Sequence, residues 1–549
     1  MKRRSHSGRG QQQLDIVLSY HPRATEIGLD VLRSGGNAFD AFVATTMAEY
    51  VLSEGGTSMA GLVGALLYNA KTGALEYLDA DYNRVADPAG MWNPRMKKVG
   101  KAIPIPGAIA GLEALSKRHG TKPYAELLQR AVELASDGFR VSRFHAAMIA
   151  WRARLLRRSA YGRRTYFRRG KALAAGDLLR QPEVAELLVN LQREGAAYMY
   201  RGEWARQFIR TVREHGGLAT LADLAAYRVS WRRPLRTTYR NLDIYTTGGR
   251  NFGGLWTLLA LKALENTNVA RLGHFSRSAD ALALMVSTAR ATWAESWIFD
   301  YRRLDNRKFV ESRLTPAHGD RIWGRLPRGL AAPPVQRIRP HSYHVIVVDA
   351  EGNAITGTNT YQQWLPWGSG VFVHGVFLPN IRRSAAYPDE VPPGSRRVNG
   401  LTMHLVFDRR ALRFVTGSIG DTILEASYQW LVNLIDYRMG AAEAVATPGF
   451  GTFPHDVNYT NIDWTSNWLS PKIRPTIVRA LETRGLKFEQ RGPLVGTGLD
   501  SGLGAVAVVQ PNGTVDGSVA PWPGVTTAEL PAAVTPWKKQ GRRRKGGRR

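Results

Sequence analysis

The 549-residue chain contains no cysteine, which excludes disulfides, thiolate metal sites and a cysteine nucleophile. It also lacks a run of about 18 apolar residues, the length that a membrane-spanning helix needs. A chain of this length would ordinarily divide into several domains, yet no Ser/Gly-rich or Pro-rich linker interrupts its middle. We therefore expect one large intertwined globule, for which a hydrophobic content of 44% supplies an ample core.

Acidic residues are scarce beside basic ones, with 45 Asp and Glu against 75 Lys and Arg and a net charge of +30. Part of this excess lies in residues 1–13 and 536–549, which we predict to be disordered basic tails. A second concentration lies between Arg152 and Lys171, where arginines alternate with aromatic residues. The favoured interpretation is a solvated arginine-rich surface. It still predicts non-specific, salt-sensitive binding to polyanions through the tails and this segment.

Several other features are missing. The basic start of the chain is not followed by an apolar run of about 7–15 residues, so we predict no secretory signal and a cytoplasmic protein. His341, His344 and His404 lack the spaced carboxylates or cysteines of a metal site. The glycine-rich stretches do not form a strand-to-helix phosphate loop. We therefore expect no metal and no nucleotide cofactor.

The hydrophobic pattern predicts a mixed α+β protein. Helical periodicity predicts helices over residues 23–32, 125–135, 256–264 and 279–296. Strand patterns with glycine-containing turns cover residues 62–68, 343–348, 354–358, 403–407, 413–416 and 505–509. Helices thus cluster before residue 342, and strands cluster around and after it.

Residues 342–362 are the most informative stretch. An apolar strand, a turn at Gly352 and Asn353, and a second strand rich in hydroxyl groups predict a β-hairpin. This hairpin is similar to the one that opens the catalytic subunit of the γ-glutamyltransferase family, whose precursor cuts itself before a threonine at that position. Further family landmarks follow in family order along most of the chain: the Gly-Gly-Asn-Ala corner at 35–38, Ile-Pro-Gly at 105–107, Gly-Gly-Leu at 216–218 and Gly-Ser-Ile-Gly at 417–420.

The resemblance implies a fold and a division of the chain. The fold is the four-layer αββα sandwich of N-terminal-nucleophile hydrolases, with two stacked, mainly antiparallel sheets between helical layers. Cleavage between His341 and Ser342 would separate a mostly helical large subunit, residues 14–341, from a strand-rich catalytic subunit, residues 342–535. The two fragments would remain one heterodimer because they share a core.

An N-terminal nucleophile combines an attacking hydroxyl with a free α-amino group that acts as the base. The reference pKa of that amine, about 7.7–8, suits proton transfer near neutral pH. Ser342 has the required hydroxyl, and it lacks only the methyl group of the family's usual threonine. By resemblance, Thr360 positions the nucleophile and Gln362 stands where the family has a substrate-contacting asparagine. Gly420 and Asp421 stand where two glycines supply the backbone N–H groups of an oxyanion hole.

The substrate pocket departs from the family pattern. Arg84 corresponds to the arginine that binds the α-carboxylate of a glutamyl group, which suits a bidentate guanidinium. Ser384, however, replaces the aspartate that binds the α-amino group, and Asn399 and Gly400 replace a serine pair that holds the carboxylate. Burying an ammonium without an anionic partner costs several kcal/mol. We therefore predict a small carboxylated substrate that is not a standard γ-glutamyl compound, and whose acyl group lacks an α-amino group.

Three functional hypotheses remain open from the sequence. The first is a self-processing amidohydrolase or acyltransferase that acts on an amide or related bond of a carboxylated metabolite. The second is true γ-glutamyl transfer with a rebuilt pocket, in which another acid, with Glu425 or Asp421 nearest in sequence, replaces the missing one. The third is a catalytically inactive relative kept as a binding or scaffold protein. An inactive relative has no need to cut itself before Ser342.

Overall fold

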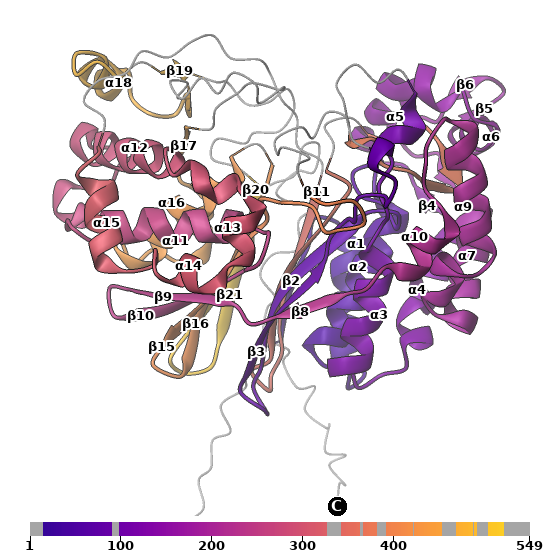
Figure 1. Ribbon diagram of the computed structural model, residues 1–549, viewed down its shortest axis with the longest axis horizontal. Helices are drawn as coiled ribbons and strands as arrows, with labels where there is room; N and C mark the ends of the chain where they lie inside the picture. The colour runs from indigo at the N-terminus through magenta and orange to yellow at the C-terminus, as the bar shows by residue number, and fades with distance from the viewer. Residues whose placement is uncertain are drawn as a thin grey trace, which may run out of the picture.

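The computed structural model describes residues 15–90, 98–326, 342–362, 366–381, 391–420, 422–452, 468–486, 488–490 and 503–520. Two six-stranded sheets are stacked face to face, and helices cover the outer face of each (Figure 1). This arrangement confirms the predicted α+β, four-layer αββα sandwich. His341, Ser384, Asp421 and both basic tails lie outside the described residues.

The first sheet has the strand order β1-β11-β12-β2-β3-β8, with antiparallel neighbours throughout. Its centre is the predicted hairpin, in which Ser342 lies opposite Thr360 and Val348 opposite Ala354. The bounds of its strands are β1 Ile16–Leu18, β2 Leu62–Asn69, β3 Ala74–Ala80, β8 Ser230–Arg232, β11 Ser342–Val348 and β12 Ala354–Thr360.

The second sheet has the order β21-β20-β16-β15-β10-β9 and is also antiparallel. Its bounds are β9 Leu235–Tyr239, β10 Leu242–Thr246, β15 Thr402–Asp408, β16 Ala411–Ile419, β20 Leu503–Val509 and β21 Val515–Val519. Short strand pairs lie outside the two sheets: β4 Phe139–Arg140 with β7 Leu178–Leu179, β5 Phe167–Arg168 with β6 Lys171–Ala172, β13 Phe372–Val373 with β14 Val376–Phe377, and β17 Phe450–Gly451 with β18 Trp468–Leu469 and β19 Glu489–Gln490.

The helices divide between the two outer layers. Those that precede β8 lie on the side of the first sheet, and most later ones lie on the side of the second (Figure 1). The first group is α1 Pro22–Arg33, α2 Ala38–Leu52, α3 Ala108–His119, α4 Tyr124–Asp137, α5 Arg143–Leu156, α6 Ala160–Tyr166, α7 Pro182–Glu194, α8 Ala197–Tyr200, α9 Glu203–Glu214 and α10 Leu221–Ala226. The second group is α11 Gly253–Leu264, α12 Ala279–Trp293, α13 Tyr301–Asp305, α14 Arg307–Glu311, α15 Pro316–Trp323, α16 Ile423–Ile435, α17 Ala441–Ala446 and α18 Pro475–Glu482.

Strand β11 is apolar on both faces because both of its faces are buried. Val345 and Val347 pack against the helical layer of the first sheet, whereas Ile346 and Val348 pack between the two sheets. Successive side chains of a strand point to opposite faces, and a strand covered on both sides needs apolar residues at every position. The burial of both faces accordingly explains the continuous apolar run over residues 345–348.

The segments before and after residue 341 share both sheets. In the first sheet β11 pairs with β1 and β12 pairs with β2, so the hairpin is enclosed by strands from the earlier part of the chain. In the second sheet β15 pairs with β10. These pairings make one intertwined body, as the lack of linkers predicts. Within the described part of the chain, no helix combines the length and apolarity needed to span a membrane.

Candidate functional site

Ser342 and Thr360 are brought together at the first residue of β11 and the last residue of β12. The Ser342 hydroxyl donates a hydrogen bond of 2.7 Å to Thr360 Oγ1, which also accepts the backbone N–H of Gln362 at 2.9 Å. Thr360 is buried and Ser342 is half-buried. Directly opposed positions of an antiparallel pair place their side chains close together. The hairpin register therefore sets the distance between the predicted nucleophile and the hydroxyl predicted to position it.

Gly420, another predicted site residue, lies at the same end of the sandwich. Thr356 Oγ1 on β12 donates to the carbonyl of Thr416 on β16 at 3.2 Å, and the next residue, Gly417, packs against His344 of β11. His344 lies opposite Thr358 in the hairpin, so residues 356–358 of β12 and 416–417 of β16 follow one another in the same order. Strands β12 and β16 therefore run in the same direction where they cross. As a result, Gly420, just after β16, emerges at the same end as Thr360.

Asn399 and Gly400 reach that end through the neighbouring strand. Thr402 on β15 pairs with Ser418 on β16, so Gly400 and Gly420 each lie two residues beyond that pair. Gly420 has a φ of 100°, a left-handed conformation that favours glycine. The structure thus assembles Ser342, Thr360, Gln362, Asn399, Gly400 and Gly420 from two sheets.

A cluster of hydroxyl groups braces the turn between β16 and α16. Ser418 Oγ lies 2.6 Å from Thr402 Oγ1 and 2.7 Å from Ser427 Oγ, and it also donates to the carbonyl of Ile423. All three hydroxyl groups are buried. Because buried hydroxyl groups are costly unless they are hydrogen-bonded, this cluster holds the end of β16, next to Gly420, against the start of α16.

Gln362 and Asn399 belong to a chain of side-chain hydrogen bonds that ends on Asp81. Gln362 Nε2 donates to Asn399 Oδ1, and Asn399 Nδ2 donates to Asp81 Oδ2. Asn399 Oδ1 also accepts the backbone N–H of Gly400 at 2.7 Å. We call Asp81, Asn399 and Gln362 the amide relay. Gln362 has a φ of 54°, a strained conformation for a non-glycine residue.

Asp81 is the residue of the site that sequence reasoning missed. It follows β3 and stands three residues before Arg84, yet the landmarks around Arg84 gave it no role. Burial, together with the negative charge of Asp79, raises the pKa of Asp81 to about 6. Two aspartates, Asp79 and Asp81, around the end of a strand were the available signal in the sequence. Its link to Asn399 is a contact between distant segments, which the sequence does not reveal.

Two arginines surround the acidic pair Asp79 and Asp81. Asp79 forms ion pairs with Arg232 at 3.1 Å and with Arg396 at 3.2 Å. Arg396 also donates to the backbone carbonyl of Asp81 and to the hydroxyl of Tyr227. Two carboxylates are therefore balanced by two guanidinium groups beneath the relay.

Arg84 is buried and is therefore not an ordinary surface arginine. Its guanidinium donates to the carbonyl of Val391 at 2.7 Å and to that of Pro88 at 3.2 Å. These contacts tie the segment after β3 to the segment before β15. Binding of a substrate carboxylate by Arg84 stays a prediction.

Glu425 does not suit the role of a replacement acid for an ammonium group. Its side chain is completely buried in α16, where Oε1 accepts the Trp293 indole N–H and the Thr452 hydroxyl, each at 2.9 Å. Burial raises the pKa of Glu425, which disfavours its charged form. The hypothesis of true γ-glutamyl transfer therefore loses one of its two candidates, and the other, Asp421, lies outside the described residues.

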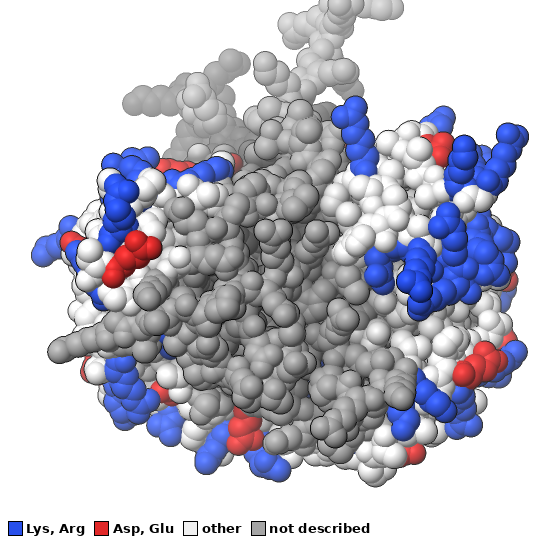
Figure 2. All heavy atoms as spheres, turned by 90° about the horizontal axis from the view of Figure 1, so that it is seen from above, with Lys and Arg blue, Asp and Glu red and all other residues white. Residues whose placement is uncertain are grey.

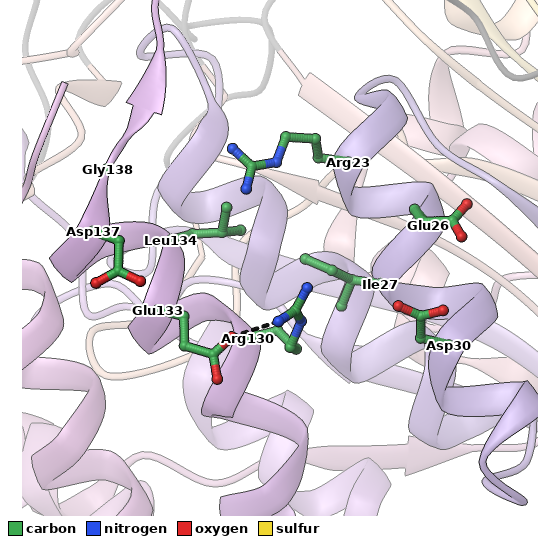
Figure 3. Close-up of a pocket in the computed structure, with 9 residues that line it drawn as sticks. All are labelled: Arg23, Glu26, Ile27, Asp30, Arg130, Glu133, Leu134, Asp137 and Gly138. Carbon is green, nitrogen blue, oxygen red and sulfur yellow. Dashed lines mark hydrogen bonds and ion pairs between the residues drawn. The ribbon is translucent and has the colours of Figure 1, made fainter. Parts of the chain in front are cut away.

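A charged depression of about 200 Å³ lies elsewhere, between α1 and α4 (Figure 3). It is lined by four carboxylates, two arginines, two apolar side chains and Gly138, and Arg130 pairs with Glu133 at 2.6 Å. It shares no residue with the surroundings of Ser342. Across the described ranges, no three His, Asp or Glu side chains form a cluster that could hold a metal ion.

Known proteins resemble this chain along most of its length. The gamma-glutamyltranspeptidase family model matches residues 24–510. Glutathione hydrolase proenzyme from Escherichia coli (strain K12) is 27% identical over 518 residues, which covers 86% of this chain and 85% of that protein. Acylase ACY 1 proenzyme from Pseudomonas sp. (strain SE83) is 28% identical over 543 residues, which covers 92% of this chain and 91% of that protein.

Solved structures share the fold. The crystal structure of cephalosporin acylase from Bacillus halodurans superposes with a TM-score of 0.78 at 22% identity, covering 95% of this chain and 98% of that one. Helicobacter pylori gamma-glutamyltranspeptidase superposes with a TM-score of 0.52 at 25% identity, covering 60% of this chain and 94% of that one. With its ordered sequence landmarks, its αββα sandwich and the match over residues 24–510, the chain belongs to the gamma-glutamyltranspeptidase family.

Proposed function

We propose that the protein is a self-processing amidohydrolase or acyltransferase whose nucleophile is Ser342. The observation that carries this proposal is the 2.7 Å hydrogen bond from Ser342 Oγ to Thr360 Oγ1 at the start of β11. It orients a hydroxyl at the position where cleavage would create a new N-terminus. Curated relatives that cover most of the chain are named as proenzymes, which is consistent with processing.

Self-cleavage would begin with attack of Ser342 Oγ on the carbonyl carbon of His341. The peptide bond shifts to an ester, which frees the α-amino group of Ser342, and water then hydrolyses the ester. In the mature enzyme this amine takes the proton of Oγ as the hydroxyl attacks an amide substrate. Backbone N–H groups at Gly420 and Asp421 would stabilise the oxyanion. The substrate C–N bond then breaks, and the amine leaves with the proton held by the α-amino group. Water, or an amine acceptor, finally releases the acyl group from Ser342 Oγ.

The substrate we propose is an amide or related derivative of a small carboxylated acid other than a standard γ-glutamyl compound. Support comes from the replacement of the family's amine-binding aspartate by Ser384 and from the burial of Glu425. An ammonium group would therefore lack the anionic partner that the family provides. Arg84 is the proposed ligand of the carboxylate.

Cleavage would leave a heterodimer of residues 14–341 and 342–535, with the two basic tails attached. The pairings of β11 with β1, β12 with β2 and β15 with β10 join the two fragments through backbone hydrogen bonds in both sheets. Separating the fragments would expose both buried faces of the central hairpin. We therefore expect the cut chain to co-purify as one particle. A cytoplasmic location stays a prediction.

The test is intact-mass analysis of purified wild-type protein beside Ser342→Ala and Ser230→Ala. Ser230 is a matched control because it also begins a strand, β8, and is also half-buried. We expect wild type and Ser230→Ala to separate into residues 1–341 and 342–549 under denaturing conditions, while Ser342→Ala stays whole. A wild-type chain that stays uncut would contradict the proposal and favour an inactive relative that acts as a scaffold.

A further inference from the structure

The polarity of the amide relay is fixed at its buried end. Asp81 accepts a hydrogen bond on each oxygen, from the backbone N–H of Tyr82 on Oδ1 at 2.6 Å and from Asn399 Nδ2 on Oδ2. Asn399 Oδ1 faces the backbone N–H of Gly400 at 2.7 Å. An ionised carboxylate only accepts and a backbone N–H only donates. The Asn399 amide therefore has one allowed orientation.

The orientation of the Asn399 amide determines the orientation of the Gln362 amide. Because Asn399 presents its oxygen, Gln362 must turn its Nε2 toward Asn399. Its Oε1 becomes the outer end of the relay, and no described residue donates a hydrogen bond to that atom. Gln362 is half-buried, whereas Asn399 is 3% and Asp81 4% exposed. The accessible end of the relay is thus a hydrogen-bond acceptor.

The outer end of the relay lies beside the proposed nucleophile. The backbone N–H of Gln362 donates to Thr360 Oγ1, the atom that accepts the Ser342 hydroxyl. An acyl group held on Ser342 would therefore be within reach of the Gln362 side chain. The buried charges beneath the relay are balanced, since Asp79 pairs with both Arg232 and Arg396.

We propose that Asp81 is a positioning residue that sets acyl selectivity by holding the relay with an acceptor facing the substrate. The enzyme then selects acyl groups that carry a hydrogen-bond donor near the scissile carbonyl. A neutral hydroxyl suits this acceptor better than an ammonium, because it avoids the cost of burying an unpaired charge. The inference rests on the proposed function and narrows its substrate class to hydroxylated carboxylic acids.

The first test is Asp81→Asn. An asparagine has one oxygen for the two donors, Tyr82 N–H and Asn399 Nδ2. The backbone donor cannot rotate, so the new amide turns its NH₂ toward Asn399. Reversal of Asn399 would satisfy this NH₂ but would turn Asn399 Nδ2 toward the Gly400 N–H, so each orientation of the relay now leaves two donors facing each other. The relay loses its single orientation, and its outer end becomes a donor in part of the molecules. Selectivity should move from donor-bearing toward acceptor-bearing acyl groups.

The measurement is kcat/KM for the 1-(p-nitroanilides) of glutaric, 2-hydroxyglutaric and 2-oxoglutaric acids, in which the substituent at C2 is next to the scissile carbonyl. In wild type we expect the 2-hydroxy compound to exceed the unsubstituted one. In Asp81→Asn that ratio should fall by about three- to tenfold, the value of one neutral hydrogen bond, and the 2-oxo compound should gain relative to the unsubstituted one. The ratio of the kcat/KM values for two substrates, measured on one sample, does not depend on the fraction of the enzyme that is correctly folded.

Asp349→Asn is the matched control. Asp349 is 5% exposed and accepts the Asn353 side-chain amide at 2.8 Å, so it is also a buried aspartate paired with an asparagine, at the opposite end of the same hairpin. We expect it to lower stability without changing the substrate ratios. Equal loss for all three substrates in Asp81→Asn would show a purely structural role and overturn the inference.

A pH profile gives a readout that a structural role would not move. Protonation of Asp81 turns one of its acceptors into a donor, as the asparagine does. Burial and Asp79 raise the pKa of Asp81 to about 6, and the other charged groups facing this pair are Arg232 and Arg396. The wild-type preference for the 2-hydroxy substrate should decline as the pH falls through about 6, while Asp81→Asn shows no such change.

Binding of the free acids separates the two proposals. If wild type hydrolyses none of the three anilides, calorimetry with 2-hydroxyglutarate and glutarate decides the outcome. A preference for 2-hydroxyglutarate that Asp81→Asn abolishes would uphold the relay while the proposed reaction fails. Equal affinity of wild type for both acids would overturn the relay.

Discussion

Successive side chains of β11 point to opposite faces of the sheet and therefore make different contacts. Ser342 faces Thr360 across the hairpin, whereas the hydroxyl of the next residue, Tyr343, donates to Glu54 Oε2 at 2.9 Å. His344 is buried and contacts Thr358 and Thr356, each at 2.8 Å. Burial lowers the pKa of His344 to about 3, so this histidine is neutral at physiological pH and acts in packing. The proposed nucleophile, Ser342, therefore begins a strand whose next two side chains are held by hydrogen bonds.

A buried acid beneath β12 predicts a pH-dependent stability. Glu49 accepts the Asn359 amide at 2.8 Å, and burial raises the pKa of Glu49 to about 8. Between about pH 4.5 and 8 the folded state keeps a proton that the unfolded state has released. Rising pH therefore lowers the free energy of unfolding, by up to about 1.4 kcal/mol per pH unit for this group. Glu49→Gln should remove that slope.

Urea denaturation of wild type and Glu49→Gln at pH 5, 6.5 and 8 measures this effect. We expect the variant to gain stability relative to wild type as the pH rises, since a glutamine side chain cannot ionise. Glu186→Gln, at an exposed position of α7, is the control and should follow the wild-type slope. Parallel curves for wild type and Glu49→Gln would show that Glu49 is ionised in the folded protein over this range.

Close contact between β11 and β16 depends on the absence of a side chain at Gly417. A Cβ at this position would lie 2.1 Å from the imidazole atoms Cε1 and Nε2 of His344. The imidazole is held by two hydroxyl groups of β12, so it has little freedom to move away. The close packing of β11 on β16, which lie in different sheets, therefore requires glycine at this position.

Gly417→Ala should lower the free energy of unfolding by roughly 1–3 kcal/mol, as overpacking of a core does. Chemical denaturation measures the loss. Gly440→Ala is the control, since a Cβ there would meet its nearest atom only at 4.0 Å, and it should be close to neutral. The double variant Gly417→Ala with His344→Ala tests the cause. The two losses must be less than additive if the imidazole is the obstacle.

The molecule as a whole is strongly basic on one flank. Asp177 is the only acidic residue between Val141 and Arg180. Lysine and arginine side chains gather over this flank, where Figure 1 places α5 and α6 (Figure 2). Trp151 on α5 is 42% exposed within this basic surface. Ion pairs there are few, one being Arg164 with Glu183 at 2.5 Å.

Polyanion binding through this flank is the matching prediction. Replacing Arg154, Arg158 and Arg169 with glutamine should weaken retention on heparin or duplex DNA. The slope of log affinity against log salt should decrease by roughly 0.9 for each phosphate contact that is lost. Fluorescence anisotropy at several salt concentrations measures both quantities.

The control for this prediction replaces three exposed basic residues on the other side of the molecule, Arg271, Arg277 and Lys308. It lowers the net charge equally. If both triple variants lose the same affinity, only the overall charge matters and the flank is an ordinary solvated surface. A larger loss from the variants on α5 and after α6 would assign the binding to this surface.

Local patterns in the sequence predicted the helices and strands named here correctly. The periodicity over residues 125–135 corresponds to α4, and the apolar run after Ser342 corresponds to β11. The helix predicted over residues 279–296 ends at Trp293, because Thr292 and Trp293 complete the last buried turn and the chain then turns at Ala294. The pairing of Ser342 with Thr360 was expected from the family resemblance, and the register of the hairpin places the two residues opposite each other.

The sequence alone predicted the hairpin, the alternation of its side chains and the family landmarks, because each of these depends on residues that are close together in sequence. The amide relay was not, because Asp81, Gln362 and Asn399 come from three separate segments that meet only when the two sheets stack. Hydrogen-bond polarity at such a meeting point depends on which donors and acceptors face each other, and no local pattern records that. Local sequence patterns therefore determined the helices and strands of this protein. The hydrogen-bond polarity of the amide relay was decided only by tertiary packing.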